Sequence, residues 1–106
     1  MAITQTQSAA LLDAPQVANG SFLDDAASPA AISITLGFTP KYVRVVNQTT
    51  RVMYEWFEGM TAAHALKTVA AGTRTAETSG GITVTSKGFS APAPAQNDQI
   101  RWQAFA

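Results

Sequence analysis

The sequence predicts an all-β protein, a small antiparallel β-sandwich or jelly-roll-like barrel that follows an extended N-terminal arm. Three observations predict this class: short segments in which apolar and polar residues alternate, turn residues between them, and no long segment with helical periodicity. The chain has 106 residues, the length of one domain. We therefore expect an arm over residues 1–18 and a single β-sandwich domain over residues 19–106.

The predicted arm is rich in Ala, Gln, Ser and Thr and has neither a sustained helical nor a sustained strand periodicity. Pro15 ends the single helical turn that residues 8–13 would allow. Such a composition is typical of a segment that becomes ordered only against a neighbouring molecule. We expect its large apolar residues to contact a partner: Leu11, Leu12 and Val17.

Strand patterns begin after Asn19-Gly20, a dipeptide that predicts a turn. Residues 21–23 are a first short strand, and residues 31–36 alternate between apolar and polar. One face of that second strand would carry Ile32, Ile34 and Leu36.

Residues 41–47 and 51–57 predict an antiparallel hairpin, the strongest local prediction in the sequence. The first segment is rich in valine, which is favoured in strands, and residues 48–50 form a short polar turn. The second segment alternates, so one side would carry Val52, Tyr54 and Trp56.

The rest of the chain predicts one short helix or loop and three further strands. Residues 61–66, with Thr61 as a cap, span under two helical turns, so a loop is an equal alternative. Residues 73–78 and 82–86 are Thr-rich strands joined by a hairpin turn at Ser79-Gly80-Gly81. Residues 88–98 form a loop with two prolines, and residues 99–105 form the last strand. One face of that strand would carry Ile100, Trp102 and Ala104.

The charge composition argues against several classes of protein. Charged residues make up 13% of the chain, against ~25% in ordinary domains, and the formal net charge is zero. We expect no nucleic acid as a partner, because the chain lacks a basic footprint. We expect no membrane contact, because no apolar run approaches the ~20 residues that span a bilayer.

The charges are divided unevenly along the chain. Residues 1–40 contain three Asp and no Lys or Arg, whereas residues 41–106 contain all seven bases and four acids. This division predicts an acidic arm that reaches over a basic body, of a neighbouring subunit or of another protein. We therefore place three basic residues at protein contacts: Arg44, Arg51 and Arg74.

No motif in the sequence predicts catalysis, a metal site or a cofactor. The chain has no Cys, its only histidine is His64, and it has no Gly-x-Ser-x-Gly elbow. Glu55 and Glu58 lie three residues apart, so on one strand they would point to opposite faces rather than act as a pair. We expect a protein that is not an enzyme and binds no cofactor and no metal.

Two segments carry a resemblance to a known family. The first is residues 37–47, Gly-Phe-Thr-Pro-Lys-Tyr-Val-Arg-Val-Val-Asn, followed by residues 54–60, Tyr-Glu-Trp-Phe-Glu-Gly-Met. The second is residues 66–75, followed by Ser-Gly-Gly-Ile-Thr-Val at 79–84. This order resembles small virion structural proteins of tailed bacteriophages that are identified as head decoration, or cement, proteins. The resemblance covers about residues 36–89 and the final Trp-containing strand.

The resemblance implies a non-enzymatic protein that binds an icosahedral capsid lattice, often as a trimer. We expect the major capsid protein and further copies of this chain as partners, with a trimer favoured over a dimer. A domain of under about ninety residues with few large apolar side chains has a marginal core, and oligomerisation is one usual remedy. The expected location is the capsid surface of the virion, after synthesis in the bacterial host cytoplasm.

Two alternatives remain open. The same β module would serve as a connector in a phage tail or fibre. The third hypothesis is a carbohydrate-binding β-sandwich that uses Tyr54, Trp56 and Trp102 as a stacking platform. Against that hypothesis, the three aromatic residues are expected in the core of a chain that has few large side chains.

Overall fold

The computed structural model describes residues 16–23, 25, 27 and 30–106, and this part of the chain forms eight antiparallel strands and no helix. The prediction of an antiparallel all-β protein is confirmed. The strands are β1 (Val17–Leu23), β2 (Ile32–Thr35), β3 (Tyr42–Asn47), β4 (Val52–Phe57), β5 (His64–Thr68), β6 (Arg74–Thr85), β7 (Gly88–Ala91) and β8 (Gln99–Phe105).

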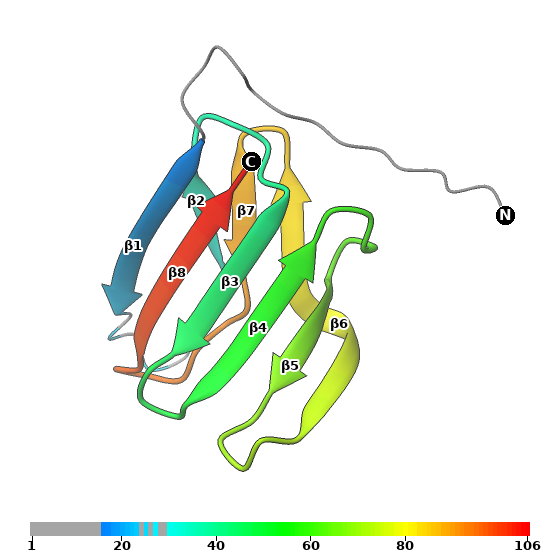
Figure 1. Ribbon diagram of the computed structural model, residues 1–106. Coiled ribbons are helices and arrows are strands. Elements are labelled where there is room, and N and C mark those ends of the chain that lie inside the picture. Colours follow the sequence, from blue (N-terminus) through cyan, green and yellow to red (C-terminus); the bar gives the residue numbers. More distant parts are fainter. Residues whose placement is uncertain (1–15, 24, 26, 28–29) are drawn as a thin grey trace, which may run out of the picture.

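All eight strands belong to one sheet that curls over itself as a half-barrel, in the order β1-β8-β3-β4-β5-β6-β7-β2 (Figure 1). The first half of β6 pairs with β5 and the second half pairs with β7, so β6 continues from one layer into the other. β1 and β2 are the two edges of the sheet. The molecule therefore resembles a sandwich whose two layers share one strand.

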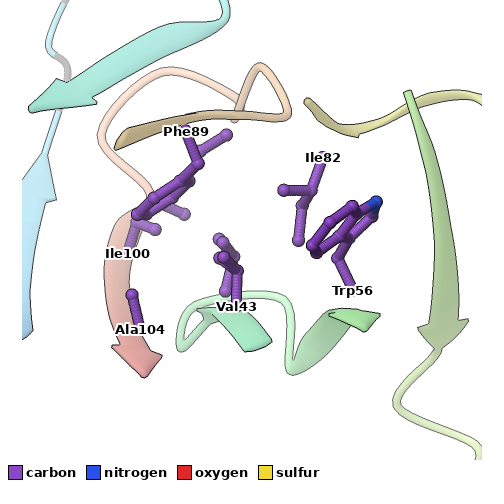
Figure 2. Close-up of a cluster of buried hydrophobic side chains, with 8 residues drawn as sticks. Val43, Trp56, Ile82, Phe89, Ile100 and Ala104 are labelled. Atoms are coloured by element: carbon purple, nitrogen blue, oxygen red, sulfur yellow. The ribbon is translucent and has the colours of Figure 1, made fainter. Parts of the chain in front are cut away.

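The core lies between the two layers (Figure 2). Phe89 on β7 and Ile82 on β6 point toward Val43 on β3 and Ile100 on β8. Alternate residues of β3 and β8 are buried, as expected for strands with one face on the core. The buried apolar residues are Val43, Val45, Trp56, Ala65, Ile82, Phe89, Ala91, Ile100 and Ala104.

The predicted hairpin over residues 41–57 is confirmed. β3 pairs with β4 from Tyr42 opposite Phe57 to Asn47 opposite Val52. The Asn47 side-chain oxygen accepts hydrogen bonds from the backbone N–H groups of Thr49 (3.1 Å) and Thr50 (3.0 Å), which closes the turn.

The predicted turn at Asn19-Gly20 is wrong, because both residues lie in the middle of β1. Gly20 pairs with Trp102, and a Cβ atom on Gly20 would lie 2.7 Å from the Trp102 ring. The glycine therefore serves a close approach between strand and ring and not a turn. β1 begins at Val17, so the sheet begins two residues before the predicted boundary at residue 19; residues 1–15 of the predicted arm lie outside the described residues.

Of the two alternatives for residues 61–66, the short helix is wrong, and the loop is correct for residues 61–63 only. Residues 61–63 form a turn, and β5 begins at His64. Ala65 is fully buried, and β5 pairs with β4 on one side and β6 on the other. Tertiary pairing thus decides the structure of a segment whose local helical preference is weak.

The predicted hairpin turn at Ser79-Gly80-Gly81 is a bulge inside β6 instead. Ala65 pairs with Glu77 while the preceding residue, His64, pairs with Ile82, so residues 78–81 have no counterpart on β5. This bulge lies where β6 leaves one layer and enters the other. The connection between β6 and β7 is at Ser86-Lys87, and β7 occupies the first part of the segment that was expected to be a loop.

Candidate functional site

The most distinctive surface of the described chain is a row of four apolar or aromatic side chains on the outer face of the sheet, opposite the core. Val17 on β1 pairs with Phe105 on β8, Phe105 pairs with Tyr42 on β3, and Tyr42 pairs with Phe57 on β4. The four residues lie at successive register positions and cross four adjacent strands. We call Val17, Phe105, Tyr42 and Phe57 the apolar row.

Strand alternation places the apolar row on the outer face. Trp56 and Ala104, the chain neighbours of Phe57 and Phe105, are buried, so Phe57 and Phe105 point the other way. Val17 is 53% exposed, Phe57 45% and Phe105 37%. Large apolar side chains that are exposed together indicate a contact surface more strongly than single exposed ones do.

Tyr42 joins the row into one aromatic cluster. Its ring is 5.1 Å from the Phe57 ring in an edge-to-face arrangement and 5.7 Å from the Phe105 ring in a stacked one, measured between centroids. Both are the arrangements that aromatic rings favour. The side chains are therefore fixed against one another before any partner binds.

The Tyr42 hydroxyl donates a hydrogen bond to the Glu55 carboxylate, with an oxygen–oxygen distance of 2.8 Å. Burial, followed by the hydrogen bond and the negative charge of Glu55, raises the pKa of Tyr42 to about 12. The hydroxyl thus stays protonated at neutral pH and presents its hydrogen to Glu55. The polar end of Tyr42 is satisfied within the molecule, which leaves its ring free for apolar contacts.

A polar row lies beside the apolar row on the same face. It consists of Asn19, Gln103, Arg44 and Glu55 at successive register positions on β1, β8, β3 and β4. A shallow open hollow lies here, with Arg44, Arg101 and Gln103 in its lining. The one basic and one acidic residue of the polar row are direct cross-strand partners.

The structure brings together only part of the predicted contact set. Val17 lies in the apolar row and Arg44 in the polar row, on one face. Arg51 lies in the β3–β4 turn, at the opposite end of the strands, with a backbone φ of 61°. Arg74 begins β6, and its Nε donates to the Thr68 hydroxyl at 3.2 Å. Leu11 and Leu12 lie outside the described residues.

Sequence reasoning missed three members of the apolar row: Tyr42, Phe57 and Phe105. The strand alternation in the sequence could have identified two of them. Phe57 follows Trp56 and Phe105 follows Ala104, and both preceding residues belong to the face of the predicted strand that carries its alternating apolar residues. An aromatic residue out of phase with those residues occupies a solvent-facing position. Their alignment into one row, however, depends on β8 lying between β1 and β3. This pairing joins strands that are far apart in the sequence.

The aromatic platform of the carbohydrate hypothesis is absent from the described surface. Trp56 is 7% exposed, while Tyr54 and Trp102 are packed against the core cluster. Trp102 meets Phe89 edge to face, with 5.4 Å between ring centroids. The three side chains therefore interdigitate in the core, and the observation on which that hypothesis depended is lost.

The buried carboxylate in the described chain has a structural role. Asp98 accepts hydrogen bonds from the Asn47 side-chain amide (2.7 Å) and from the backbone N–H of Ala95 (3.2 Å). These bonds fix the proline-containing loop to the end of β3. His64 is half-buried at the start of β5.

The described residues contain no group of three or more His, Cys, Asp or Glu side chains placed to hold a metal ion. Among the same residues, no helix has the length and apolar character needed to cross a membrane. Comparison of the chain with protein-family models, with curated proteins and with solved structures gives no match.

Proposed function

We propose that this protein is a non-enzymatic structural protein of a tailed-bacteriophage virion, a head decoration protein that binds the outside of the capsid lattice and bridges capsomers. The observation that carries the structural side of this proposal is the apolar row. An exposed, prearranged set of Val17, Phe105, Tyr42 and Phe57 is suited to contact with another protein surface.

The resemblance of residues 36–89 to small phage virion proteins supports a phage capsid as the lattice that the protein binds. Burial of apolar surface between protein subunits would stabilise the head, with no bond made or broken. The partners would be the major capsid protein and other copies of this chain, and the site of action would be the capsid surface. The resemblance favours a trimer over a dimer.

The segment before the sheet would provide a second attachment. It runs directly into Val17, the first member of the apolar row, and contains Leu11 and Leu12. Because Val17 and Ala18 pair with Phe105 and Ala104 in the sheet, a deletion that tests this segment should end at residue 15. A deletion through residue 18 would remove part of β1 and confuse loss of contact with loss of fold.

The first prediction concerns binding to heads of the phage that encodes the chain, prepared without this protein. The full chain should sediment with expanded heads at a saturating, fixed number of copies per capsomer and should raise the temperature at which the heads open. Deletion of residues 1–15 should lower occupancy while the circular dichroism spectrum keeps its β signature.

Three outcomes would contradict the proposal or a part of it. A gene that lies in no phage or prophage would contradict the virion assignment. Electron microscopy that places the protein on tails or fibres would favour the connector alternative. Full occupancy after deletion of residues 1–15 would show that this segment does not hold the protein on the head.

A further inference from the structure

The apolar row is self-complementary about one axis. We propose that a second copy of this chain covers the row, related by a two-fold axis that lies in the interface, parallel to the strands and midway between β8 and β3. About this axis Phe105 lies opposite Tyr42 of the second copy, and Val17 lies opposite Phe57 of the second copy. Every member of the row then meets an apolar or aromatic partner.

The geometry of packed sheets permits this match. Sheets that pack face to face lie ~10 Å apart with strand directions within about 30° of each other. When the two sheets are rotated relative to each other by up to about 30°, the positions beside the axis are displaced least. The central pair of Phe105 and Tyr42 therefore keeps its alignment best.

The neighbouring polar row supports the same partner. About the same axis, Arg44 lies opposite Gln103 of the second copy and Glu55 lies opposite Asn19 of the second copy. No charge faces a like charge, and the neutral chain as a whole does not repel its copy. A strongly basic or strongly acidic partner, by contrast, would find charges of both signs on this face, Arg44 and Arg101 together with Glu55.

The available area sets the strength of the contact. Four strands ~4.8 Å apart and about seven residues long give a footprint of roughly 450 Å² per copy. This is below the ~800 Å² per partner of a stable protein–protein interface. The pair is therefore a concentration-dependent dimer that forms where copies are crowded together, and it does not require a phage head.

The test measures the mass of the full free chain in solution, over a concentration series, by sedimentation velocity. The wild-type protein should shift from monomer to dimer as its concentration rises toward 1 mM, about the limit of weak specific association. Phe57→Lys should lower the dimer fraction at a given concentration at least tenfold. The matched control is Leu23→Lys, on the same face of β1 and similarly exposed (50%, against 45% for Phe57), but at the rim of the footprint, at the far end of β1 from the row, where a lysine can extend into solvent. This control should dimerise like the wild type.

A charge-exchange pair tests the axis itself. Val17→Lys and Phe57→Glu should each weaken self-association, whereas an equimolar mixture of the two should associate, because the introduced lysine meets the introduced glutamate. The restored dimer should weaken in high salt, which screens exposed charges. A mixture of Val17→Lys with Phe57→Lys should remain monomeric.

Four outcomes overturn the proposal: a wild-type chain that stays monomeric throughout the series, the trimer that the phage resemblance favours in place of this two-fold dimer, equal loss in Phe57→Lys and Leu23→Lys, or a charge-exchange mixture that fails to associate. Circular dichroism of each variant separates loss of contact from loss of fold. Since no heads are present, failure here leaves the capsid proposal to its own experiment.

Discussion

At the scale of single residues, Tyr42 has two roles, one for its ring and one for its hydroxyl. Its ring occupies the centre of the apolar row, between Phe57 and Phe105. Its hydroxyl is held by Glu55. A phenylalanine would supply the ring alone, so the tyrosine also couples the row to the charge of the neighbouring strand.

We predict that Tyr42 ionises far above the usual tyrosine range. The chain has two tyrosines, so Tyr54→Phe leaves Tyr42 as the only one. In this variant, tyrosinate absorbance near 295 nm should show a midpoint close to the pKa of about 12. Glu55→Gln should move the midpoint down without returning it to 10, because burial is the largest cause of the raised pKa.

The same raised pKa determines how stability depends on pH. The fold favours the protonated hydroxyl, so the contribution of Tyr42 is complete below pH 10 and is lost as pH rises toward 12. Unfolding followed against pH should show this loss in the wild type and a smaller one in Tyr42→Phe. A midpoint of 10 in the Tyr54→Phe titration would contradict both expectations.

At the scale of elements, the strands with clean alternation were predictable from sequence. In β2, β3 and β8 the more buried and the more exposed residues alternate along the strand. β5 and the bulge in β6 were not predictable, because the alanine and glycine residues there are compatible with more than one local structure. In residues 79–81 the glycines form a bulge where the local pattern is that of a hairpin turn, and only the pairing of β6 with two different strands distinguishes them.

The same limit applied to the candidate site. Val17 and Arg44 were predicted as contacts and lie on the same face, yet the reasons were composition and charge and not pairing. The apolar row itself depends on β8, the last strand in the chain, lying between β1 and β3. Long-range register of this kind leaves no signal in a local window of sequence.

We predict that the bulge in β6 requires glycine at position 81 more than at position 80. A Cβ atom on Gly81 would lie 2.7 Å from the backbone carbon and oxygen of His64, atoms that cannot move without breaking the β5–β6 ladder. Gly81→Ala should lower the free energy of unfolding by about 1–3 kcal/mol, the usual range for forced overpacking, and by more than Gly80→Asn does.

Gly80 supplies the control for this prediction. It has a φ of +67° and open space around it, and asparagine tolerates that conformation. Gly80→Asn should cost no more than about 1 kcal/mol in urea-induced unfolding. Equal costs for the two variants would mean that the bulge is not held by the close approach at Gly81.

At the scale of the whole molecule, the structure alters the predicted division of charge. With the sheet beginning at Val17, residues 1–15 contain only Asp13 as a charged residue. Residues 16–106 then contain seven bases and six acids. Two of the three acids of residues 1–40 thus follow β1, so most of the negative charge of that part of the chain lies after the first strand and not before it. In the dimer proposed above, apolar contact, more than charge, would hold the copies together.

The core of the described chain contains few large side chains, which makes each of them important. Phe89 is 1% exposed and is the largest fully buried side chain described. We predict that Phe89→Ala lowers the free energy of unfolding by about 3–5 kcal/mol, a large part of the total for a small domain. The matched control is Phe57→Ala, whose ring is exposed, measured at a dilution where the chain is monomeric.

Urea unfolding of the two variants would decide whether the core or the outer face stabilises the monomer. If Phe57→Ala lowered the free energy of unfolding as much as Phe89→Ala does, the division between the core and the apolar row would be contradicted. Such a result would mean that the aromatic cluster on the outer face is itself a second core.

The last backbone N–H of the chain, on Ala106, donates to the carbonyl oxygen of Gln16 at 2.8 Å. The sheet thus starts and finishes at one corner, and β1 and β8 lie side by side although they are the most distant strands in the sequence (Figure 1). A peptide linker of a few residues would join residue 106 to residue 16 and turn the domain into a covalent ring. New ends could then be opened in the turn at residues 48–50. The order in which the eight strands are synthesised is therefore separable from their arrangement, and the same sheet is compatible with several gene architectures.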